Sequence, residues 1–182
     1  MTQRPALALR IIAAILFLTS AAWSAAYLAG LPFNSTTAGM SVVHAGLWLL
    51  IAWLALRNHP GQMAHAMPGW VTAAFLYGAA LYAPAVNAND AAVSLQGRLG
   101  LSNLQFGLIS PTAEELLKFT AVFVLCTMVM RIQRPVEAVT VAIAVGFGFS
   151  AVENATYILR GALENLNSDL EGSLVAAGLR CL

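Results

Sequence analysis

The sequence predicts an all-α protein, a polytopic bundle of transmembrane helices. Of its 182 residues, 59% are hydrophobic and only 9% are charged, whereas about a quarter of the residues of a typical soluble domain are charged. The apolar residues come in long blocks without the alternation of a transmembrane strand, which favours helices over a barrel. We therefore expect a single integral membrane domain over residues 1–182.

Five stretches of the chain are long and apolar enough to cross a bilayer, since a transmembrane helix needs about 20 mainly apolar residues. They are residues 11–30, 38–56, 67–86, 111–130 and 137–159. Turn-forming residues separate them at Pro32–Ser35, Asn58–Gly61, Asn87–Asp90 and Gln133–Pro135. The apolar run within residues 161–182 is too short to span, so we expect a truncated sixth helix there.

The arginines predict the orientation of the bundle, because positive residues gather on the cytoplasmic side of a membrane. With the amino terminus in the cytoplasm, that side holds Arg4, Arg10, Arg57, Arg131 and Arg134. The opposite side then holds Arg98, Arg160 and Arg180. The net charge is +1 and no basic cluster is present, so nucleic acid is not an expected partner.

Four charged side chains lie where lipid would be expected: Glu114, Glu115 and Lys118 in the fourth predicted helix, and Glu153 in the fifth. A charge at the centre of a bilayer costs about 2.5 to 3.5 kcal/mol on insertion scales, so such residues usually face a polar interior and serve a function. Lys118 follows Glu114 by four residues and Glu115 by three, so one ammonium can pair with both carboxylates. One glutamate would then be free to bind a water or accept its proton.

The spacing of the two helices predicts that their charged groups meet. If the turn at Ile132–Pro135 joins antiparallel helices, counting outward places Glu114 level with Glu153, and Lys118 level with Phe149, toward the outer leaflet.

The fifth helix also carries a stripe of small residues, Ala142, Gly146 and Ser150, which continues to Glu153 and Asn154. Small residues let helices approach closely. We therefore expect this stripe to pack against the fourth helix and to hold Glu153 near the glutamate pair.

These residues resemble the PrsW family of intramembrane proteases, which is related to the CAAX-prenyl protease superfamily. The family pattern Glu-Glu-x-x-Lys matches Glu114, Glu115 and Lys118, and the pattern Phe-x-x-x-Glu matches Phe149 and Glu153. The resemblance covers roughly residues 105–160, the protease-like core, while the helices at 11–30, 38–56 and 67–86 are generic.

The resemblance implies hydrolysis of membrane-anchored proteins, such as anti-sigma factors, in the bacterial plasma membrane. Glu114 or Glu115 would activate a water, Lys118 would orient the pair, and Glu153, followed by Asn154, would act as ligand or acid. Two mechanisms stay open: a divalent metal such as zinc, with Glu114, Glu115 and Glu153 as candidate ligands, or a glutamate-activated water without a metal.

The third motif of the family, a histidine on a following helix, has no match, because His44, His59 and His65 all precede Glu153. His44, in the second helix, could serve as a ligand or proton carrier, but we interpret it as a core histidine bonded to a neighbouring backbone group. His59 and His65 share a loop, and two ligands alone are weak evidence for a metal site. The missing motif leaves open a truncated or inactive copy of the enzyme.

Two other functions are compatible with the same residues. Buried carboxylates and a lysine also mark ion paths, which would suit a transporter or proton relay, although the Glu-Glu motif has no second copy in the sequence. The other is a non-catalytic scaffolding relative that binds protein substrates without cutting them.

Overall fold

The structure, a computed structural model, describes residues 7–60, 69–101, 110–130, 132–165 and 167–181. These residues are helical apart from short connections, and no strand occurs among them, which confirms the all-α prediction. The elements are α1 (Leu7–Ala29), α2 (Ser35–Leu56), α3 (Trp70–Ala80), α4 (Tyr82–Arg98), α5 (Ser110–Val124), the π-helical turn η3 (Leu125–Val129), α6 (Pro135–Glu164) and α7 (Asp169–Cys181).

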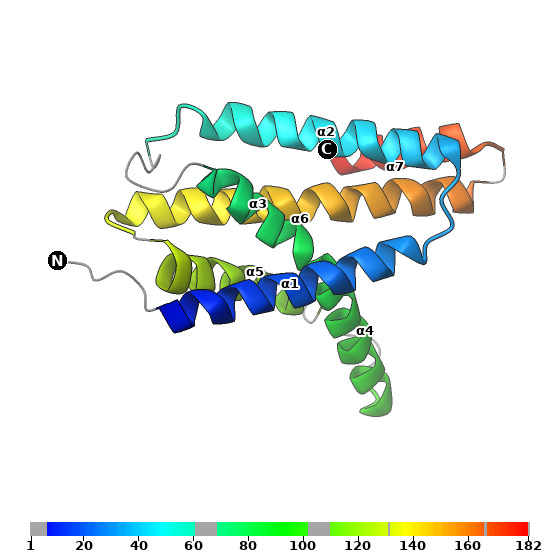
Figure 1. Cartoon of the computed structure of the whole chain (residues 1–182). Helices are drawn as coiled ribbons and strands as arrows, with labels where there is room; N and C mark the ends of the chain where they lie inside the picture. Colours follow the sequence, from blue (N-terminus) through cyan, green and yellow to red (C-terminus); the bar gives the residue numbers. More distant parts are fainter. Residues whose placement is uncertain (1–6, 61–68, 102–109, 131, 166, 182) are drawn as a thin grey trace.

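Helix α6 is the centre of the bundle and contacts α2, α3, α5 and α7. Helices α2 and α6 run side by side, α3 packs across α6 and α1, and α4 projects from the bundle (Figure 1). By length and composition, α1, α2, the α3–α4 pair (Trp70–Arg98) and α6 are able to cross a membrane. At about 1.5 Å per residue, α6 is about 45 Å long, enough to reach from one headgroup region to the other.

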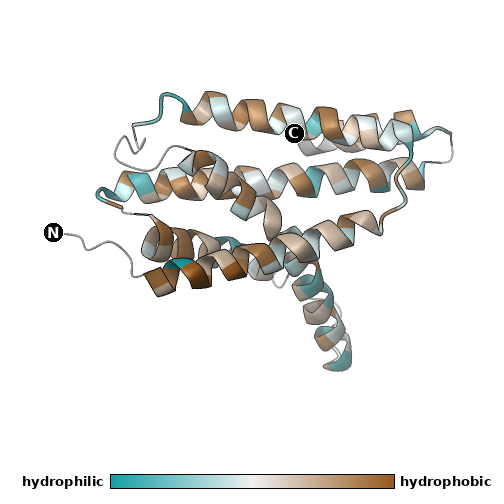
Figure 2. Cartoon of the chain, viewed as in Figure 1, coloured by the Kyte–Doolittle hydropathy of each residue, from teal (hydrophilic) through white to brown (hydrophobic). Residues whose placement is uncertain are grey.

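The outer surface of the bundle is apolar. Large hydrophobic side chains on α1 and α2 are exposed, among them Ile15, Leu18, Val42 and Val43. Figure 2 shows the hydrophobic colouring along α1 and the hydrophilic residues that gather on α4. An apolar surface of this extent is suited to lipid contact.

The region between residues 67 and 98 differs from the prediction. The helix breaks at Leu81, and α4 then continues through Asn87–Asp90, so the turn predicted there is wrong. The Asn87 side chain donates to the Ala83 carbonyl one turn earlier in the same helix (2.9 Å). Asparagine can bond to backbone groups inside or outside a helix, and here it bonds inside it.

The stretch 111–130 is helical, but it is divided into the 15-residue α5 and the five-residue η3. It is not among the four helices able to span by length and composition. Its three charges, Glu114, Glu115 and Lys118, lower its hydropathy. At the other end of the chain, residues 169–181 form α7, which packs against α6 where Gly172 meets the Gly161 carbonyl.

Helices α3 and α6 cross with their backbones in contact. A Cβ atom at Gly78 would lie 2.0 Å from the Val145 oxygen, and one at Gly148 would lie 1.8 Å from the Phe75 oxygen. Neither position has room for a side chain. The crossing therefore depends on these two glycines.

The start of α6 holds a carboxylate that sequence reasoning missed. Glu137 is fully buried and accepts hydrogen bonds from the Gln133 amide (2.7 Å), the Arg134 amide (3.3 Å) and the Arg134 side chain (3.0 Å). One turn further, Thr140 bonds to His59 after α2 (2.8 Å). The starts of α1 and α6 and the end of α2 thus share one end of the bundle (Figure 1).

Candidate functional site

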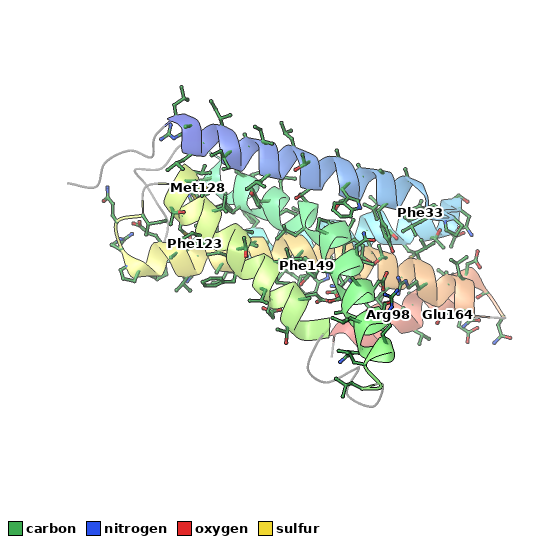
Figure 3. The ribbon with its side chains drawn as sticks, turned by 90° about the horizontal axis from the view of Figure 1, so that it is seen from below. Phe33, Arg98, Phe123, Met128, Phe149 and Glu164 are labelled. Atoms are coloured by element: carbon green, nitrogen blue, oxygen red, sulfur yellow. The ribbon has the colours of Figure 1, made fainter. Side chains whose placement is uncertain are left out.

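Lys118 joins the two motifs. Its ammonium lies 2.8 Å from the Glu115 carboxylate and 4.3 Å from the centre of the Phe149 ring, which is 1% exposed. This contact confirms the prediction that Lys118 and Phe149 lie at the same depth on the two helices. Figure 3 labels Phe149 on α6, where α4 and α5 pass in front of it.

The two neighbouring glutamates point to different sides of α5. Glu114 shares a helix face with Ala121 and Leu125, each 2% exposed, so it points toward the interior. It accepts a hydrogen bond from Asn89 of α4 at 2.7 Å. The side chain of Glu115 is 70% exposed and pairs with Lys118. The expected sharing of one ammonium by both carboxylates is therefore replaced by two separate pairings.

Glu153 follows Phe149 by one turn of α6, and Glu114 precedes Lys118 by one turn of α5. Because the two helices run in opposite directions, both glutamates lie on the same side of the Lys118–Phe149 contact. Glu153 is half-buried and within electrostatic range of the Tyr82 hydroxyl. That Glu114 and Glu153 lie at the same depth in the membrane stays a prediction, which this arrangement favours.

Tyr82 ties α4 to the same part of α6. Its hydroxyl bonds to Thr156, its ring packs 6.1 Å from that of Phe149, and Thr156 in turn donates to the Glu153 carbonyl (2.7 Å). Nothing in the motif pattern pointed to Tyr82 or Asn89. Both lie on α4, which the sequence divided into the end of a span and a turn.

Asn154 lies on a different face from Glu153. It is 3% exposed and follows Phe147 and Ala151 at helical spacing, and these two pack with Ala52 of α2 and Phe75 of α3. Asn154 is thus placed toward the packed side of α6. Its role in the site stays a prediction.

A groove of about 520 Å³ runs between α2, α5 and α6. It is lined by Trp48 of α2, by Glu115, Lys118, Phe119 and Val122 of α5, and by Ala142, Ile143, Gly146, Phe147 and Ser150 of α6. The small-residue stripe thus forms a groove wall instead of the expected close contact with α5. A Cβ atom at Gly146 would meet nothing within 4 Å.

His44 and His59, the two histidines that the structure describes, do not line this groove. His44 is 6% exposed, as predicted for a core histidine, but its ring nitrogen Nε2 accepts a hydrogen bond from the side chain of Trp48 (Nε1, 2.9 Å), one turn later in α2, and not from the predicted backbone group. His59 bonds to Thr140 at one end of the bundle. His65 lies outside the described residues.

Within the described ranges, the site does not bring together enough donor side chains for a metal ion. In the part of the chain that the structure describes, no three His, Cys, Asp or Glu side chains come together. Glu114 and Glu115 face different sides of α5, so with Glu153 they do not form a three-ligand set. These donors do not fit a metal site.

The chain matches the model of a known protein family. A family model described as PrsW family intramembrane metalloprotease matches residues 66–182. The match includes α3 and α4 as well as the helices that carry the two motifs. No curated protein and no solved structure matches the chain.

Proposed function

The chain belongs to the PrsW family of intramembrane metalloproteases, as its match over residues 66–182 shows, and from this we propose that it hydrolyses membrane-anchored proteins at the groove between α2, α5 and α6. The observation that carries the proposal is the Glu115–Lys118 pair that lines this groove. Glu114 does not line the groove; it lies on the adjacent face of α5, one turn before Lys118. A charged pair next to an apolar groove gives a substrate both a binding surface and reactive groups.

The groove suits one segment of a membrane-anchored substrate. Its walls are mainly apolar, and the small residues Ala142, Gly146 and Ser150 leave room for a peptide backbone. A substrate helix must unwind to be cut, and each unpaired peptide group in lipid costs several kcal/mol. Lys118 and Ser150 offer donors for such groups. We propose anti-sigma-factor-like proteins, with one membrane anchor, as the substrate class.

We assign the water-activating role to Glu114. Glu115 is committed to its ion pair with Lys118, whereas Glu114 accepts a hydrogen bond from the neutral Asn89 amide and points to the interior. Its remaining lone pairs are available to a water. A carboxylate in this position can act as a general base.

The proposed reaction uses side chains alone. The water oxygen bonds to the substrate carbonyl carbon while one water proton passes to Glu114. The Lys118 ammonium stabilises the negative oxygen of the tetrahedral intermediate. The C–N bond then breaks as the leaving nitrogen takes a proton from protonated Glu153, and Glu114 returns its proton to Glu153.

The test uses the full chain in liposomes, with a single-pass model substrate that carries a reporter domain on each side of the membrane. Glu114→Gln should lower the cleavage rate by about 100-fold or more, Glu115→Gln by less, and the control Glu164→Gln not at all. If each of the two single variants, Glu114→Gln and Glu115→Gln, cleaved the substrate at the wild-type rate, the proposal would be overturned. Proton flux in the same liposomes without any cleavage would favour a proton relay.

The family description suggests a divalent metal such as zinc. The proposed reaction has no metal-dependent step, because the donor side chains among the described residues do not form a three-ligand set. Cleavage should therefore persist after dialysis against a chelator. Loss of cleavage that zinc restores would replace Glu114 as base by a metal-bound water.

We also propose that the protein lies in the bacterial plasma membrane with its amino terminus in the cytoplasm. Arg10, Arg57 and Arg134 lie at or near one end of the bundle, as the prediction requires. A green fluorescent protein fused to the amino terminus should be fluorescent in bacteria, because it does not fold after export through the general secretion pathway. A fusion protein that is fully inserted but not fluorescent would show the opposite orientation.

A further inference from the structure

Helix α4 contributes a side chain to the site that neither sequence motif contains. The Asn89 side-chain nitrogen donates to Glu114 Oε1 at 2.7 Å, across 25 positions of the sequence. The Asn89 side-chain oxygen is buried and has no hydrogen-bond partner in the part of the chain that the structure describes. One end of this amide is therefore bonded to a carboxylate of the site, and the other end can still accept a donor.

The way in which α4 packs explains why Asn89 reaches Glu114. Tyr82, Val86 and Asn89 follow each other at spacings of four and three, which places them on one face of α4. Tyr82 is 4% exposed and contacts Phe149, and Val86 packs against the same core. This face is therefore the inward one. The break at Leu81 separates α3 from α4, so α4 can reach α5 while α3 stays on α6.

The contact gives Asn89 two effects on Glu114. A donated N–H bond restricts the rotation of the carboxylate. Because the amide is neutral, it does so without adding a competing charge beside Lys118, as a second lysine would. Its free oxygen can also accept one proton of a water whose other proton points to Glu114.

We propose that Asn89 is a positioning residue of the site, which holds the Glu114 carboxylate in the orientation needed to receive a proton from the attacking water. This inference rests on the proposed function, since it assigns Asn89 through Glu114. It extends the site from the α5–α6 pair to a third helix.

The kinetic test compares isosteric variants of Asn89 in the liposome assay. Asn89→Leu removes the donor and the acceptor, and Asn89→Asp removes the donor and adds a like charge beside Glu114. We expect kcat to fall about 10-fold in Asn89→Leu and further in Asn89→Asp, with KM unchanged. Asn89→His, which restores an N–H donor, should recover part of the loss.

Asn87 provides the matched control, because it is exposed and its side chain, among the residues that the structure describes, bonds to the Ala83 carbonyl within α4 and not to Glu114. Asn87→Leu should leave kcat and KM at their wild-type values. Unchanged kcat in Asn89→Leu, or equal losses in Asn87→Leu and Asn89→Leu, would overturn the proposal. A fall in kcat confined to Asn89 variants with wild-type unfolding temperatures would support it.

A spectroscopic measurement separates this inference from the proposed function. The infrared band of the Glu114 carboxylate, identified as the band that Glu114→Gln removes, should shift in Asn89→Leu and not in Asn87→Leu. This shift does not require cleavage. If the band shifts but the wild-type protein cuts no substrate, the contact stands and the proposed function fails. If cleavage depends on Glu114 but the band does not move, the positioning role of Asn89 fails.

Discussion

The two sides of α6 use the same residue type for opposite purposes. At Gly148 the α3 backbone is so close that a Cβ atom would lie 1.8 Å from the Phe75 oxygen. At Gly146, two positions earlier, a Cβ atom would meet nothing within 4 Å, and the residue lines the groove. One side of the helix is thus closed by backbone contact and the other is open. The open side is the one that Lys118 and Glu115 reach.

The carboxylates show the same contrast. Glu137 is fully buried, with two backbone amides and Arg134 as donors, and its environment leaves little capacity for a further ligand. Glu115 pairs with one lysine at the groove, and Glu114 accepts from one amide. A saturated carboxylate holds a structure together, whereas a carboxylate with lone pairs to spare can bind a reactant.

The largest effect is expected from Gly148→Ala on the closed side. The new methyl group would collide with the Phe75 backbone, which cannot move as a flexible side chain does. Overpacking of this kind typically costs about 1 to 3 kcal/mol and occasionally more, and we expect the upper end here. Thermal unfolding in detergent measures it, with Gly146→Ala as the control. Equal stability of the two variants would remove the contrast between the sides.

The next effect is expected from Glu137→Gln. The amide group has one acceptor oxygen instead of two, so at least one of the three donors loses its partner, at a cost of about 1 to 3 kcal/mol. Chemical unfolding of the purified protein should show the loss. The cleavage rate at a temperature where the variant is folded should equal that of the wild type. A selective loss of kcat would instead place Glu137 in the reaction.

Filling the open side is expected to change substrate binding. Gly146→Leu should raise KM about 10-fold, equivalent to about 1.4 kcal/mol, because its side chain would occupy the groove between α5 and α6. The unfolding temperature should stay near that of the wild type. An unchanged KM would show that the substrate binds elsewhere.

The smallest effect is expected in the stability of Glu115→Gln. Its ion pair with Lys118 joins side chains that are 70% and 21% exposed, and pairs of this kind contribute about 0 to 1 kcal/mol. Chemical unfolding should thus give a change below about 1 kcal/mol. A loss as large as that of Glu137→Gln would mean that this pair supports the fold as well.

The sequence predicts the helical architecture and the Lys118–Phe149 register because both depend on local periodicity and on the position of one turn. It does not predict which glycine of α6 is in contact with the α3 backbone, since Gly146 and Gly148 differ only in whether α3 lies opposite them. The break at Leu81 and the continuation through Asn87 were missed because asparagine suits both turns and helices.

The partner of Glu114 was missed for a related reason. Asn89 comes from a segment that was predicted to be a turn, and its contact spans 25 positions. No spacing rule within one helix, or across one turn, brings the two residues together.

The π-helical turn η3 has a consequence for the length of the motif-bearing helix. A π turn accommodates one residue more than the α-helical turn that it replaces. Deletion of one residue within Leu125–Val129 can therefore return this turn to α geometry and leave the phase of α5 unchanged. The same deletion within Leu116–Val124 would rotate the acidic face by about 100°. Close to its end, this helix can thus lose a residue without turning its acids away from their partners.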